Sequence, residues 1–181
     1  MDYRDLPRIG NMKKLFSEEE WNKVVRLPQM CMGMTAFADG KADFKERATI
    51  ISLSSNTKLY KKNELMLEIF SHYRAWPDES GNIIKPLTIT DPDLEELGND
   101  HNYLVDTFNL LKQKISEDAY VKFVSMLICI MKSVAEASKE SFFSAQRISE
   151  DEVEAMDLIA SLSGVGLEQA VIIAQQEAWF D

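Results

Sequence analysis

The fold of this chain is decided by residues 30–46, which read MCMGMTAFADGKADFKE. An apolar run ends at Ala38, and Gly40 stands where a helix stop is expected, because glycine tolerates a positive φ. Asp43 and Glu46 are three residues apart and match a capping box, in which each side chain bonds a backbone N–H of the other residue. The stretch therefore predicts a helix, a tight acidic turn and the start of another helix.

The composition favours a helical, globular chain. Its 181 residues suit one domain with a sizeable core, and 45% of them are apolar. With only 7 glycines and 5 prolines, a turn-rich all-β fold is disfavoured. The net charge of −10 repels polyanions, so we expect cations and basic proteins rather than nucleic acid as partners.

Nothing in the apolar patterning predicts export or membrane insertion. The N-terminus lacks the apolar core of a secretory signal, and the longest apolar run, residues 123–131, is about half of the ~20 residues that span a bilayer. Cys31 and Cys129 each lie within an apolar helical run, as buried cytosolic thiols do. We therefore expect a cytoplasmic protein with no transmembrane segment and no disulfide.

Capping residues and apolar spacing predict an all-α bundle of about seven to eight helices. Ser17 with Glu20, and Ser149 with Glu152, match further capping boxes, and Pro28 is expected to interrupt one helix and begin the next. In the helix that starts after Asp43, one side is predicted to carry Phe44, Ala48, Ile51 and Ser55, with Ile50 and Leu53 close to it. In the last helix, the residues predicted to face inward are Leu167, Ala170, Val171, Ala174 and Trp179. Helical spacing from Tyr60 onward predicts another helix, with Asn63 or a neighbour as its cap, up to Trp76-Pro77. Gly164 is expected to end the helix that contains residues 153–162.

We expect one domain over residues 1–181. Three parts stand outside its regular pattern: an N-terminal extension at 1–16, an irregular connection at 77–90 and an inserted loop at 138–148. The insertion follows from an internal repeat. An apolar helix end precedes the capping box by four residues at Asp39–Asp43 and by eleven at Ser138–Ser149, so the second copy is seven residues longer. Two such hairpins can pack around a pseudo-twofold axis.

The repeat resembles the TerB (tellurite-resistance protein B-like) family over about residues 30–174. The first half is carried by ADG at 38–40, by Asp43 and Glu46, and by ELMLEIF at 64–70; the second half is carried by VAEA at 134–137 and SEDE at 149–152. The resemblance implies a compact all-α fold built from two related hairpins. It also implies a non-enzymatic binding or adaptor role in stress or tellurite resistance, with protein partners that include a membrane-associated resistance complex.

The family is associated with divalent-metal binding through acidic residues, which implies a Ca²⁺ or Mg²⁺ site at Asp39, Asp43 and Glu46. Carboxylates from a helix–helix turn can converge on such a hard cation. The other interpretation is that Asp43 and Glu46 only cap a helix, and the two interpretations can overlap. Ser138-Lys139 stands in the second copy where the first has Asp39-Gly40, so we expect any cation at the first turn.

The remaining candidate groups favour structural interpretations. The sulfur-containing run at residues 30–34 suggests a soft-metal site, but residues two apart on a helix point to nearly opposite sides, which favours core packing. His72 and His101 stand alone. An acidic group is explained by a solvated first helical turn, with cation binding as a minor alternative; it comprises Asp91, Asp93, Glu95 and Glu96. Phe142-Phe143 and Trp179-Phe180 would form a docking patch if exposed.

Two other functions stay open. One is a metal-dependent hydrolase whose acidic residues activate a water. The other is a structural, dimerising helical domain, which makes a homodimer one of the expected assemblies. The chain lacks a phosphate-binding glycine loop, a Cys-x-x-Cys pair, a His-Glu-x-x-His helix and a nucleophile elbow, which lowers the expectation of an enzyme.

Overall fold

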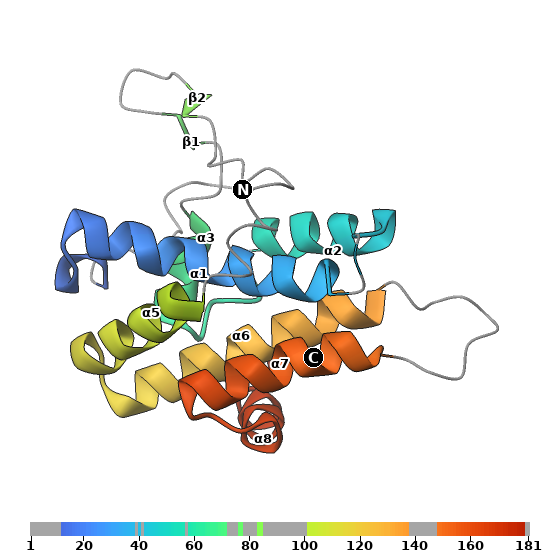
Figure 1. Cartoon of the computed structure of the whole chain (residues 1–181). Helices are drawn as coiled ribbons and strands as arrows, with labels where there is room; N and C mark the ends of the chain where they lie inside the picture. Colours follow the sequence, from blue (N-terminus) through green and yellow to red (C-terminus); the bar gives the residue numbers. More distant parts are fainter. Residues whose placement is uncertain are drawn as a thin grey trace.

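Helix α6 (Glu117–Ala137) lies at the centre of the structure, and its residues are buried over most of its length. The structure is a computed structural model that describes residues 12–38, 40, 42–56, 58–71, 76–77, 83–84, 101–137 and 148–179. Within them, α6 is contacted by α1 (Glu18–Ala36), α2 (Phe44–Ser55), α3 (Glu64–Ser71), α5 (His101–Lys114), α7 (Glu150–Ser163) and α8 (Leu167–Glu177). Figure 1 shows these helices gathered into one bundle, which confirms the predicted all-α fold.

The predicted capping residues set several helix boundaries. Ser17, Asp43 and Ser149 each accept a hydrogen bond from the backbone N–H three residues later, and each capping box is complete. Gly164 ends α7 in the left-handed conformation at φ 77°, and Gly40 has φ 104°. Asn63 caps α3, because its Oδ1 accepts from the Met66 N–H at 3.1 Å. These contacts satisfy N–H groups that a helix start leaves without an intrahelical partner.

The predicted break at Pro28 is wrong, because α1 runs through it without interruption. A proline inside a helix removes one hydrogen bond and crowds the carbonyl four residues earlier, which here belongs to Val24. Val24, Leu27 and Met30 are fully buried on either side of Pro28. Burial of both turns against the bundle outweighs the lost bond.

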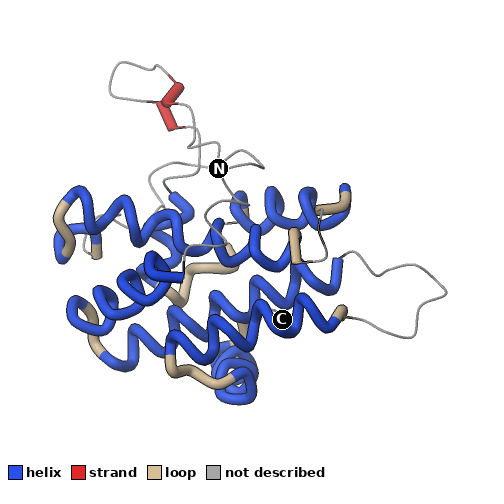
Figure 2. Tube along the Cα trace, viewed as in Figure 1, coloured by secondary structure: helices blue, strands red, loops and turns tan. Residues whose placement is uncertain are grey.

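The predicted end of the helix at Trp76 is also wrong. Helix α3 ends at Ser71 within the described residues, and β1 (Trp76–Pro77) pairs antiparallel with β2 (Ile83–Ile84), Trp76 opposite Ile84. A residue that precedes a proline is disfavoured in the helical region, which explains extended backbone at Trp76. In the described part of the chain these two short segments are the only strands (Figure 2).

The N-terminal 3-10 helix η2 (Lys13–Leu15) is anchored by a buried carboxylate. Glu68 on α3 accepts the backbone N–H of Met12 at 3.1 Å and that of Lys13 at 2.8 Å. Phe16 is buried beside Trp21, with ring centroids 5.7 Å apart. Residues 12–16 of the expected N-terminal extension are therefore packed on the bundle; most of the connection at 77–90 and of the loop at 138–148 lies outside the described residues.

The two hairpins α1–α2 and α6–α7 exchange contacts. Helix α1 packs on α6, α2 packs on α6 as well as on α1, and α7 packs on α1 as well as on α6. Glu46 and Glu152, the third residues of α2 and α7, are both buried at the helix start. This packing is what two hairpins around a shared axis require, while their kinship as a repeat stays a prediction.

Helix α8 lies against α6, with Ala170 and Trp179 buried as predicted. Val171, which was predicted to face inward, is exposed, because it lines the cavity between α6 and α8. Within the described residues no single helix is both long and apolar enough to cross a bilayer. Helices α7 and α8 would be long and apolar enough only if they were taken together, and they meet at a bend of 86°.

Candidate functional site

The structure brings together two of the three predicted cation ligands. The Glu46 carboxylate accepts the Asp43 N–H at 2.7 Å, and Asp43 Oδ1 accepts the Glu46 N–H at 2.8 Å. The Glu46 side chain is 3% exposed. Asp39 lies outside the described residues. The observed geometry is that of a helix cap, and cation binding at Asp39, Asp43 and Glu46 stays a prediction.

Among the residues that the structure describes, no group of three or more His, Cys, Asp and Glu side chains is arranged to hold a metal ion. His101 begins α5 and is exposed, while His72 and the acidic group at 91–96 fall outside the described residues. Phe142, Phe143 and Phe180 also lie outside the described residues, so the docking patch that they would form stays a prediction.

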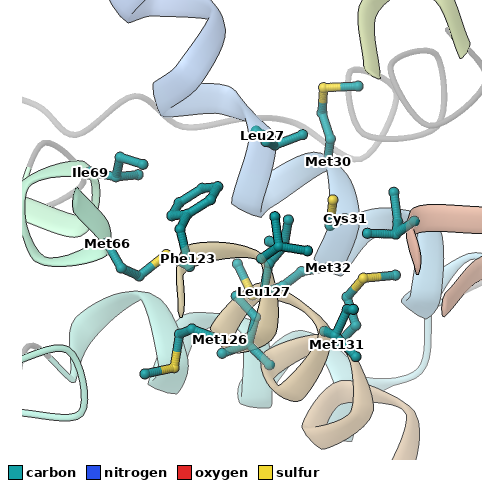
Figure 3. Close-up of a cluster of buried hydrophobic side chains, with 14 of the residues drawn as sticks. Leu27, Met30, Cys31, Met32, Met66, Ile69, Phe123, Met126, Leu127 and Met131 are labelled. Carbon is teal, nitrogen blue, oxygen red and sulfur yellow. The ribbon is translucent and has the colours of Figure 1, made fainter. Parts of the chain in front are cut away.

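The methionines and Cys31 of α1 fill the core. Met30, Cys31 and Met32 are fully buried, and Figure 3 shows Met30 and Met32 leaving α1 in different directions among the side chains of Leu27 and Leu127. Burial raises the pKa of the Cys31 thiol, because the thiolate would have to lose its hydration. Neither cysteine is in a disulfide. The sulfur atoms are therefore placed as hydrocarbon-like core filler.

One cavity combines a thiol with polar residues. It measures about 400 Å³ and lies between α6 and α8, with Cys129, Lys132 and Glu136 in its lining. Burial raises the pKa of Cys129 to about 11, with the Lys132 charge opposing the shift. A thiol that stays protonated at neutral pH is a poor nucleophile, so the cavity does not present an activated group.

A second cavity of about 400 Å³ is lined by Lys62, Lys114 and Lys122. Each ammonium group is already engaged. Lys62 Nζ donates to the Glu177 carbonyl at 2.6 Å, Lys114 lies 3.1 Å from the Glu20 carboxylate, and Lys122 lies 3.3 Å from the Glu177 carboxylate. The cavity wall is an ion-pair network that joins α8 to the rest of the bundle, and its positive charges are largely compensated.

The feature that sequence analysis missed is the outer face of α2. The prediction placed Phe44, Ala48, Ile51 and Ser55 on one apolar side of this helix, with Ile50 and Leu53 close to it. The four residues do share one side, but this side is exposed: Phe44 is 85% exposed and Ile51 is 67% exposed. Helix α2 instead packs through Glu46, with Ile50 and Leu53 against the core. It carries two apolar stripes, and the stripe that contains Ile50 and Leu53 faces the bundle.

The outer stripe has a regular spacing and a basic surround. Its members, at positions 44, 48, 51 and 55, follow the 4-3-4 spacing of a coiled-coil seam, and all four are exposed. Residues 44–63 carry one acidic side chain, Glu46, and five basic ones, namely Lys45, Arg47, Lys58, Lys61 and Lys62. The same spacing is visible in the sequence, but the sequence alone does not tell which of the two stripes faces the core. We call these four residues the α2 outer stripe.

Comparisons of the chain with family models, with curated proteins and with solved structures found no match.

Proposed function

We propose that this protein is a binding or adaptor module that docks another protein on the α2 outer stripe. The observation that carries the proposal is the exposure of Phe44 and Ile51, two large apolar side chains on one face of a well-capped helix. Covering one such side chain contributes about 1.5–3 kcal/mol, which the isolated chain forgoes at both positions. Exposed apolar side chains that share one face of a helix are candidates for an interaction surface.

The TerB resemblance supports the same class of function, since it implies an adaptor in a stress or tellurite-resistance setting. The metal-dependent hydrolase has less support, because the carboxylates of Asp43 and Glu46 bond the backbone at the start of α2. A dimerising structural domain would use the same stripe, with a second copy as its partner.

Photo-crosslinking separates these possibilities. The residue p-benzoylphenylalanine is placed in full-length protein at position 44, and as a matched control at Ile172, which is 52% exposed on α8. We expect a discrete adduct with a different protein in host cells from position 44 and none from position 172. An adduct of twice the chain's mass would instead support the dimer, and equal labelling from both positions, or none from either, would contradict the proposal.

A companion measurement tests whether the stripe contributes to the stability of the fold. The variant Phe44→Gln/Ile51→Gln should change the free energy of unfolding by less than about 0.5 kcal/mol per site, as exposed positions do, and should abolish the adduct. Leu53→Gln, on the inner stripe, should destabilise the protein by about 1–3 kcal/mol. Equal destabilisation by the two variants would show that the outer stripe belongs to the core.

A further inference from the structure

Resting on the proposed function, we infer that the occupant of the α2 outer stripe is an amphipathic helix whose apolar seam is flanked by acidic residues. The partner is a helical segment of another protein, with apolar side chains such as leucine along one face and Asp and Glu residues beside that face. It follows from two properties of α2, which are the spacing of the stripe and the charges that flank it.

The spacing points to a helix. A straight stripe with 4-3-4 spacing presents its side chains in one line, and this line fits the seam of one facing helix. The twelve residues of α2 extend about 18 Å, so the stripe matches roughly two heptads of a partner. An extended strand has no equivalent match, because α2 offers no free row of backbone hydrogen-bonding groups.

The charges point to acidic flanks. With positions 44 and 48 as the seam, Lys45 and Arg47 lie on either side of it, where facing helices exchange ion pairs. Glu46, between them, faces the bundle and is buried. The chain carries a net charge of −10, yet α2 itself carries two basic side chains, Lys45 and Arg47, and one acidic side chain, the buried Glu46. The net charge alone favours basic partners, and the local charge of α2 reverses that preference at this face.

The charges also argue against a second copy. In an antiparallel pair of α2 helices, Lys45 and Arg47 would face the serines at the other end of the copy rather than carboxylates. Self-association through this stripe therefore gains no charge complementarity, whereas an acidic helix does.

The test uses two helical peptides of two heptads with leucine at every seam position. One carries Glu and the other Lys at the flanking positions, and fluorescence anisotropy measures their binding to the full-length protein. The variants are Lys45→Glu and Phe44→Gln/Ile51→Gln. Arg47 is left intact, because its Nε donates to the Ala42 carbonyl at 3.1 Å and its guanidinium lies 5.9 Å from the Phe37 ring centre.

We expect the wild type to bind the acidic peptide at least about threefold more tightly than the basic one. Lys45→Glu should reduce this preference by a similar factor, and Phe44→Gln/Ile51→Gln should remove binding of both peptides. Equal binding of the two peptides would overturn the inference about charge and leave the proposed docking function standing. Binding of neither peptide would overturn the helical occupant, and only the additional absence of an adduct from position 44 would overturn the proposed function.

Discussion

Asp43 and Glu46 bond each other's backbone N–H groups at the start of α2, with the Glu46 carboxylate buried. This reciprocal pair fixes where α2 begins and which side of it faces the bundle. Phe44, two residues from Glu46, consequently points outward. The capping box thus connects the acidic turn noted in the sequence with the orientation of the exposed stripe on α2.

Removing the buried member of this pair should destabilise the protein. Glu46→Ala leaves the Asp43 N–H without its acceptor, and we expect a loss of about 1–3 kcal/mol in the free energy of unfolding, measured by urea denaturation. Asp43→Ser is the matched control, since serine is also a good N-cap and should change stability by less than about 0.5 kcal/mol. Equal losses in the two variants would contradict the capping account.

The cation site implied by the TerB resemblance can be tested without disturbing the cap. Asp39→Asn and Asp43→Asn each remove a charge, and asparagine at position 43 still caps the helix. If the acidic turn binds Ca²⁺ or Mg²⁺, either cation should raise the Tm of the wild type above its value in chelator. Both variants should lose this increase while keeping the Tm that the wild type has in chelator. A wild-type Tm that does not respond to the cations, at constant ionic strength, would remove the site.

Ser125 carries a buried hydroxyl that has no hydrogen-bond partner among the described residues. Replacing such a group by a methyl group removes its desolvation penalty, so Ser125→Ala should leave stability unchanged or raise it by up to about 1 kcal/mol. Ser163→Ala is the control, because the Ser163 hydroxyl donates to Ala160 and accepts from the Val165 N–H. The control should lose about 1 kcal/mol in chemical denaturation. A marked loss at Ser125 would reveal a partner for its hydroxyl.

Both cysteines should resist alkylation in the native protein. With its pKa raised to about 11, Cys129 is ionised to roughly one part in a thousand at pH 8, and Cys31 is fully buried. Iodoacetamide at pH 8 should therefore modify neither thiol until denaturant is added, after which both react. The rate at Cys129 should rise as the pH approaches 11. Fast labelling of Cys129 at pH 8 would show that the site between α6 and α8 opens or lowers the pKa.

Sequence analysis succeeded where local chemistry decides the structure. The capping boxes at Ser17, Asp43 and Ser149, and the stop at Gly164, depend on neighbouring residues only, and all are observed. It failed where tertiary packing decides. Burial of the turns on both sides of Pro28 keeps α1 continuous, and contact with α6 determines which of the two apolar stripes of α2 faces the bundle. For this second reason, the exposure of the α2 outer stripe could not be predicted from the sequence.

The most direct test of the α2 outer stripe is hydrogen exchange of the full-length protein with and without a saturating amount of the acidic peptide. We predict that the peptide slows the exchange of the amides of α2, residues 44–55, and leaves the exchange rates in α8 nearly unchanged. Protection of α8 amides instead, or protection of no α2 amide, would contradict the binding of an acidic helix to this stripe.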